Sequence, residues 1–184
     1  MNTDDGDLTR IEYERRFVVS PRTNWMGKVE SYSKAFEDKY LSNTRLRLRL
    51  LIDSDTGRRL FKLNKKQESR SPYFRAVNRI LLSPAEYELF HAMEGHEIRK
   101  TRYYHHFDGR IFSIDVFKGE LEGLVLCETE ANSLETLMGA TPPEYAKQEV
   151  TEDIFFMTPR QMKGPVSIFS ETNSAESNQW GCCI

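Results

Sequence analysis

Long apolar runs are missing from this chain of 184 residues, and cysteine is scarce. No apolar stretch approaches the roughly 20 residues of a transmembrane helix, so we expect no membrane-spanning segment and no membrane partner. The three cysteines form no disulfide framework, and the acidic start lacks the basic and apolar regions of a signal peptide, which favours a cytoplasmic location. The formal net charge of −2 gives no global field that would favour a nucleic acid as partner.

The charges that are present, 29% of the residues, gather in rows. Strand side chains alternate between two faces, so Glu12, Glu14 and Arg16 project together from one segment. Later rows are Arg45, Arg47 and Arg49, then Lys62 and Lys66, Lys100 and Arg102, Asp115, and finally Glu128 and Glu130. Taken singly, each row could be a solvated strand face or a charged edge strand. Their number in one sheet instead indicates a charged interior.

Unpaired charges are too costly to bury in a dry core, which limits where these rows can lie. Strands that close into a barrel would place the charged faces around a wet lumen and the leucine faces outward, beneath helices. Arginine and lysine on some strands would bind a polyanion. Carboxylates on other strands would hold a hard divalent ion that bridges to it.

The alternation and the turn signals predict many strands and few helices. We expect strands at 9–19, 37–52, 58–66, 73–82, 97–107, 110–118 and 122–131, with another at 147–156. A capping box at Ser83 begins a helix whose apolar side carries Tyr87, Leu89, Phe90 and Met93. Shorter helices are expected at 134–138 and within 22–36. We divide the chain into a disordered acidic start (1–8), one barrel domain (9–157) and a disordered polar tail (158–184).

In order and spacing, these segments resemble the motifs of the CYTH superfamily, also called triphosphate tunnel metalloenzymes. Glu12-x-Glu14-x-Arg16 resembles the opening Glu-x-Glu-x-Lys of that family, and Glu128-Thr129-Glu130 resembles its late Glu-x-Glu pair. Further matches are Thr44-Arg45-Leu46-Arg47-Leu48-Arg49, Phe61-Lys62-Leu63-Asn64-Lys65-Lys66, Lys100-Thr101-Arg102-Tyr103, Ile114-Asp115-Val116-Phe117 and Glu149-Val150-Thr151-Glu152-Asp153. Each match is weak alone, but the ordered set is specific.

The resemblance implies a mainly antiparallel β fold, an eight-stranded closed tunnel barrel with a few covering helices, which binds a triphosphate with Mg²⁺ or Mn²⁺. By position it implies metal ligands at Glu12, Glu14, Asp115, Glu128 and Glu130. It implies phosphate-binding cations at Arg45, Arg47, Arg49, Lys62, Lys66, Lys100 and Arg102, and catalytic candidates at Arg16, Glu128 and Glu130. We therefore expect a metal-dependent phosphohydrolase that acts on an inorganic, nucleoside or thiamine triphosphate.

Two departures from the family pattern keep other functions open. Arg16 stands where the family has a lysine, and arginine stays protonated whereas lysine can shift its pKa and help to activate water. Many hydrolytic members carry a Glu-x-Glu pair on the strand after Lys66, where this chain has Arg75 and Arg79. The alternatives are a non-catalytic module that binds a polyphosphate or nucleotide, and an adenylate cyclase of the class IV type. The oligomeric state is not readable from the sequence.

Overall fold

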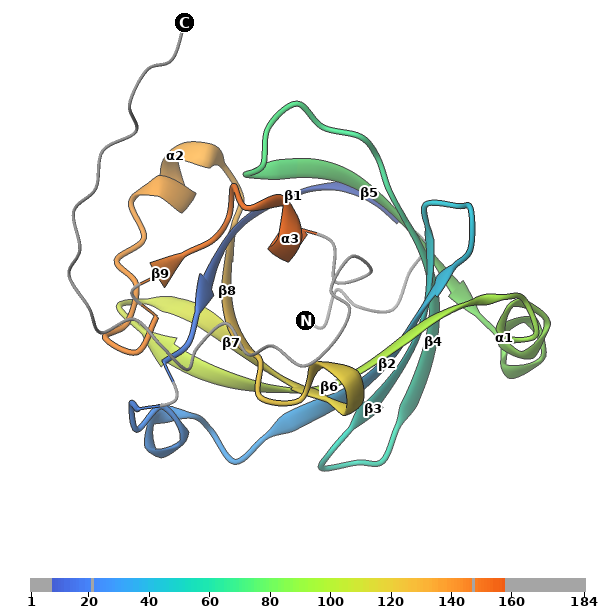
Figure 1. The fold of residues 1–184 in the computed structure, drawn as a ribbon, viewed down its shortest axis with the longest axis horizontal. Helices are drawn as coiled ribbons and strands as arrows, with labels where there is room; N and C mark the ends of the chain where they lie inside the picture. Colours follow the sequence, from blue (N-terminus) through green and yellow to red (C-terminus); the bar gives the residue numbers. More distant parts are fainter. Residues whose placement is uncertain (1–7, 21, 147, 158–184) are drawn as a thin grey trace, which may run out of the picture.

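The computed structural model describes residues 8–20, 22–146 and 148–157. Its strands are β1 (Leu8–Val18), β2 (Ser33–Leu41), β3 (Leu46–Asp53), β4 (Arg59–Lys66), β5 (Phe74–Leu82), β6 (Gly95–Phe107), β7 (Arg110–Lys118), β8 (Val125–Ala131) and β9 (Gln148–Glu149). They form one antiparallel sheet in the order β5-β4-β3-β2-β6-β7-β8-β1-β9. Because β5 also pairs with β1, the first eight strands close into a ring (Figure 1). The predicted eight-stranded barrel is therefore confirmed.

The helices are short, and Figure 1 shows α1 and α2 outside the ring. They are α1 (Pro84–His91), α2 (Leu134–Met138) and α3 (Ile154–Met157), with 3₁₀ turns at Met26–Lys28 and Gly119–Leu121. The predicted capping box begins α1: the backbone N–H of Glu86 donates to Ser83 Oγ, and the Glu86 carboxylate accepts from the backbone N–H of Ser83. No helix in the described ranges is long and apolar enough to cross a membrane.

Several predicted boundaries were wrong. The single strand expected at 37–52 is two strands, because the chain reverses near Asn43, which has a φ of +55°. The helix expected within 22–36 is only one 3₁₀ turn, and the strand expected at 147–156 is the two-residue β9 followed by α3. The disorder predicted for the two ends falls on residues outside those described, except that Leu8 already belongs to β1.

Two apolar clusters lie on the outer face of the barrel. One consists of Leu48, Leu50, Leu63 and Tyr87, where α1 covers β3 and β4. Leu89 of α1 was predicted to share this contact but is 74% exposed, because so short a helix meets the barrel along a narrow stripe. The second cluster covers β1, β7 and β8, and its members are Phe17, Val19, Trp25, Phe112, Ile114, Cys127, Tyr145 and Ala146.

A third apolar cluster lies inside the barrel. Its strand members are Val18, Ile98, Phe117 and Leu126, and each stands two positions along its strand from a charged residue of the lumen rows. They pack with Leu121, Leu124, Val150 and Phe156. This cluster, which we call the floor, makes the lumen apolar at one level and leaves the neighbouring level to the charged rows.

Because much of the apolar packing lies outside the barrel, truncation of an outward-facing side chain should destabilise the fold. Phe112 is fully buried in the second outer cluster, and we expect Phe112→Ala to lower the free energy of unfolding by about 3–5 kcal/mol. Ile11 also faces outward but is 55% exposed, so Ile11→Ala should change it by no more than about 0.5 kcal/mol. Urea unfolding of both variants is the test, and equal losses would contradict this assignment of the core.

Candidate functional site

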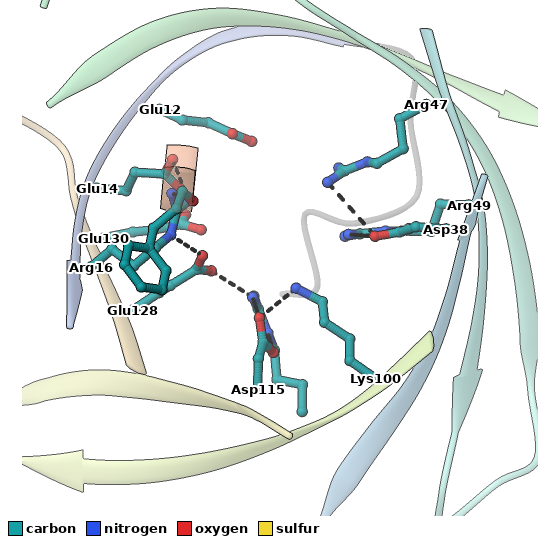
Figure 2. A network of polar contacts seen from close by, with 12 residues as sticks. Glu12, Glu14, Arg16, Asp38, Arg47, Arg49, Lys100, Asp115, Glu128 and Glu130 are labelled. Carbon is teal, nitrogen blue, oxygen red and sulfur yellow. Dashed lines mark hydrogen bonds and ion pairs between the residues drawn. The ribbon is translucent and has the colours of Figure 1, made fainter. Parts of the chain in front are cut away.

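Two adjacent strands supply an acidic wall of the lumen. β1 and β8 pair so that Glu14 lies opposite Glu130, and Arg16 lies opposite Glu128. Glu12 shares their face, and all five side chains point into the barrel (Figure 2). The strand register thus brings together two rows that the sequence separates by more than 100 positions, 112 for Arg16 and Glu128.

Arg16 lies at the centre of the acidic wall, and each of its three guanidinium nitrogens donates to an acceptor. Nε donates to Glu128 Oε1 at 2.8 Å, and Nη2 donates to Glu14 Oε1 at 3.0 Å. Nη1 donates to the backbone carbonyl of Phe156 in α3 at 2.6 Å. The Arg16 side chain is only 9% exposed, so it is held by the protein and not presented to solvent.

Asp115 extends this network from β7 to β6. It is fully buried and accepts hydrogen bonds from Lys100 and, at 2.6 Å, from both Nε and Nη2 of Arg102. Arg102 Nη2 also donates to Glu128 Oε2 at 2.6 Å. Asp115 does not line the cavity, as a ligand would, but lies behind the two cations that do. Its visible role is to position them.

Glu128 is the carboxylate on which the two halves of the network meet. Burial alone would raise its pKa, but the charges of Arg16 and Arg102 hold the pKa of Glu128 well below its usual value. Glu128 is therefore an anion with both oxygens occupied by guanidinium groups.

A basic wall faces these carboxylates across the lumen. Figure 2 shows Arg47 and Arg49 on the opposite side of the barrel from Glu12 and Glu14. The β3–β4 register places Arg47 opposite Asn64 and Arg49 opposite Lys62, so β4 continues the same polar face. Lys66 reaches back toward the acidic wall, with Nζ 3.8 Å from Glu12 and 3.7 Å from Glu14.

Asp38 of β2 is the member of the site that the sequence did not reveal. It accepts from Nε and Nη2 of Arg49 at 2.6 and 2.7 Å and lies 3.9 Å from Arg47. Burial would raise the pKa of Asp38, but these arginines lower it well below its usual value. On its strand face Asp38 stands between Phe36 and Tyr40, and a single charge between two aromatic residues forms no row to recognise.

The two walls enclose a cavity of about 1220 Å³. The lining includes the remaining phosphate-binding candidates, Arg45 and Lys62, and also Arg75 and Arg79 of β5. Arg45 lies nearer the solvent, 47% exposed and paired with Glu68 at 3.0 Å. Arg47 Nε is buried and has no hydrogen-bond partner in the described part of the chain. A buried donor without an acceptor is costly, and an anionic ligand in the cavity would satisfy it.

A divalent cation at the more exposed end of the acidic wall would have to compete with cations that already lie there. Arg10 of β1 donates to Glu12 Oε1 from Nε and Nη2 at 3.1 and 2.9 Å, and Lys66 and Arg79 lie 3.8 and 3.7 Å from the Glu12 carboxylate. Glu130 is 45% exposed, and the ion-pair partner found for it among the described residues is Arg10, 3.6 Å away. Burial raises the pKa of Glu130, and the nearby charge of Glu12 adds to this rise. The described residues contain no preformed group of three carboxylate, histidine or cysteine ligands. Mg²⁺ needs only one or two carboxylates when phosphate oxygens and water complete its shell.

Two other polar features lie away from the lumen. His105 contacts the Tyr145 hydroxyl at 2.8 Å and His106 contacts Glu30, so each of the two neighbours has its own partner, and they form no joint metal site. Cys127 is fully buried in the second outer cluster, and burial raises the pKa of its thiol. It is a packing residue.

No family model matches the chain, but it is similar to two proteins that are both named inorganic triphosphatase. The chain is 28% identical to the inorganic triphosphatase of Acetivibrio thermocellus over 163 residues, 87% of this chain and 98% of the relative. It is 42% identical to the inorganic triphosphatase of Nitrosomonas europaea over 66 residues, 35% of this chain and 44% of that protein, so this match spans less than half of the relative.

The fold has solved counterparts. The crystal structure of an inorganic triphosphatase matches with a TM-score of 0.52 and 27% identity, covering 82% of this chain and 92% of that chain. A protein from Pyrococcus horikoshii matches with a TM-score of 0.50 at 19% identity, covering 69% of this chain and 82% of that chain, and shows likeness of fold alone. These findings support a CYTH-like relationship.

The buried pair of Asp38 and Arg49 predicts a specific dependence of stability on pH. The folded-state pKa of Asp38 lies below its unfolded value, so its contribution is complete above about pH 4 and is lost as pH falls toward the folded pKa. Asp38→Asn leaves Arg49 without its carboxylate and should lower the free energy of unfolding by about 3 kcal/mol at neutral pH.

The difference in the free energy of unfolding between the wild type and Asp38→Asn should become smaller as urea unfolding is repeated at progressively lower pH. Glu122→Gln, which neutralises an exposed carboxylate, is the control and should stay within about 0.5 kcal/mol of the wild type. A deficit that stays constant with pH would show that the carboxylate charge of Asp38 is not what stabilises the barrel.

Proposed function

We propose that this chain is a metal-dependent triphosphatase that binds inorganic triphosphate in the barrel lumen and hydrolyses one of its anhydride bonds. The observation that carries this proposal is the pair of opposed walls, with cations on β3 and β4 facing carboxylates on β1 and β8 across one cavity. A polyanion bridged by a divalent ion is the ligand that matches both walls at once. The similarity to two inorganic triphosphatases supports the choice of substrate.

Within this proposal the cations divide into two groups. Arg49, Lys100 and Arg102 are oriented by the buried Asp38 and Asp115, so their remaining donors reach the lumen in fixed positions. Arg47 and Lys66 line the cavity with longer ion-pair distances, 3.9 Å from Arg47 to Asp38 and 3.7 Å from Lys66 to Glu14. Lys62 lies in the same lining, and Arg45 adds a rim contact. Arg47 is the foremost phosphate ligand, because its buried Nε lacks an acceptor in the described residues.

Phosphoryl transfer needs positioning and charge neutralisation more than covalent chemistry, and this lining supplies both. Glu12, Glu14 and Glu130 would hold Mg²⁺ or Mn²⁺, which when bound polarises a phosphoryl oxygen. Water attacks the terminal phosphorus, the bridging P–O bond breaks and pyrophosphate leaves. Arg16 cannot accept the proton of that water because it stays protonated, so we assign this step to Glu130.

A specific observation favours a second candidate, a non-catalytic module that binds a polyphosphate. Arg75 and Arg79 of β5 line the cavity. Many hydrolytic members of the resembled family were expected to carry a pair of glutamates on this strand, so the lumen has cations in their place. Such a lining strengthens anion binding and adds no group that activates water.

The purified protein with Mg²⁺ or Mn²⁺ should release phosphate from tripolyphosphate, and a chelator should stop the release. Glu128→Ala should abolish it, because Arg16 and Arg102 lose the carboxylate that positions both. Arg47→Met should raise KM roughly 10- to 100-fold by removing a charge-assisted phosphate contact. Arg99→Met, on the exposed outer face of β6, is the matched control and should leave KM unchanged.

Calorimetry separates the two candidates. Metal-dependent binding of tripolyphosphate without any phosphate release would support the module and contradict the triphosphatase. If tripolyphosphate neither bound nor was hydrolysed, both candidates would fall.

A further inference from the structure

Phe36 is an aromatic side chain at the charged level of the lumen. It lies on β2, where its register partners are Lys100 on β6 and Leu51 on β3. The residue is only 4% exposed, yet it lines the cavity. Three cations lie over its ring: Arg49 Cζ is 4.4 Å from the ring centroid, Arg102 Cζ is 5.5 Å away and Lys100 Nζ is 5.8 Å away.

These three cations belong to two groups of ion pairs on either side of the ring. On the β3 side, Asp38 accepts from Nε and Nη2 of Arg49 at 2.6 and 2.7 Å. On the β6 side, Asp115 accepts from Lys100 and from Nε and Nη2 of Arg102. Each carboxylate fixes the cations of its own group. The ring contacts both groups, so the position of one group relative to the other depends on it.

An aromatic ring holds a cation differently from a carboxylate. The negative potential of the ring face attracts the charge without taking up an N–H donor, whereas a carboxylate occupies the donors that it fixes. The hydrogen bonds to Asp38 and Asp115 use Nε and Nη2 of each arginine, so Nη1 is the nitrogen that a ligand would meet. Like charges repel strongly where water is excluded, and attraction to a shared ring counters that repulsion.

We propose that Phe36 is a positioning residue, whose ring holds Arg49, Lys100 and Arg102 together so that they converge on one phosphoryl group of the ligand. The inference rests on the proposed function in taking a triphosphate as ligand of the lumen, but it concerns anion binding alone. Long side chains that are already gathered need not be ordered when the ligand arrives, and this ordering otherwise weakens binding. Loss of the attraction to the ring should therefore lower the affinity for tripolyphosphate.

Stepwise fluorination of the ring tests this role, because fluorine withdraws electron density from the ring face and changes its shape little. The variants are Phe36→4-fluorophenylalanine, Phe36→3,5-difluorophenylalanine and Phe36→3,4,5-trifluorophenylalanine. Calorimetry with tripolyphosphate, in a chelator that prevents hydrolysis, gives the Kd of each. The Kd should rise at every step and reach roughly tenfold in the trifluoro variant, since cations over a desolvated ring contribute substantially.

Phe112 is the matched control. It is a buried phenylalanine of the second outer cluster, and its ring meets Phe107 edge-on with the centroids 6.2 Å apart. The same fluorine series at Phe112 should leave the Kd unchanged. Phe36→Tyr keeps the ring face and should stay within about threefold of the wild type, whereas Phe36→Leu should lose at least as much affinity as the trifluoro variant.

A Kd that does not change across the Phe36 series, or that rises equally in the Phe112 series, would overturn the proposal. The fluorinated variants keep the packing of the ring, so they decide the matter even if Phe36→Leu does not fold. A wild type that fails to bind tripolyphosphate in the chelator would also overturn it, while phosphate release with Mg²⁺ would still support the triphosphatase. Binding that weakens along the series in a protein that releases no phosphate would support the role of Phe36 and contradict the triphosphatase.

Discussion

Compensation of buried charge is the constraint on which this barrel depends. Ions removed from water are tolerated only when a partner of opposite sign and good geometry replaces the lost hydration. The lumen meets this demand with a chain of contacts that runs from Lys100 through Asp115, Arg102 and Glu128 to Arg16. These contacts cross β6, β7, β8 and β1, so they link four of the eight strands of the barrel. It also explains why acidic and basic rows must occur together, since neither set could be enclosed alone.

The same constraint separates the apolar residues from the charged ones. Most leucines and aromatic residues pack either outside the ring or in the floor. Phe36 is an exception at the charged level, where Arg49, Lys100 and Arg102 lie over its ring. The floor places low-dielectric material directly beside Arg16, whose third nitrogen bonds the Phe156 carbonyl there. Electrostatic interactions strengthen where water is excluded, so the charged level gains in strength from the apolar level next to it. A rigid lining of this kind is oriented before a ligand arrives, and little reorganisation is required on binding.

The alternation of side chains along each strand was enough to predict a closed barrel and its main charged rows, because a period of two fixes which residues share a face. It was not enough to predict Asp38, whose neighbours in the row are aromatic, or the separation of β2 from β3, which a left-handed Asn43 produces. Ion-pair partners were beyond the sequence as well. Glu128 meets Arg16 and Arg102 because of the register across four strands, β1, β8, β7 and β6, and no single strand encodes that register. The roles of Glu12, Glu14 and Asp115 as metal ligands stay predictions.

Arginine at position 16 changes what the two walls offer to a ligand. Arg16 compensates Glu14 and Glu128 at one end of the acidic wall, and Arg10 lies 2.9 Å from Glu12 and 3.6 Å from Glu130 at the other end. Among the described residues, the basic wall has one buried arginine donor without an acceptor, Nε of Arg47, and Lys66 reaches toward the acidic wall. Facing walls of opposite potential orient an anionic ligand, because its negative groups are drawn to the basic wall and repelled by the acidic wall. Under the proposed function, a phosphate chain would therefore lie against the cations of β3 and β4, away from the carboxylates of β1 and β8.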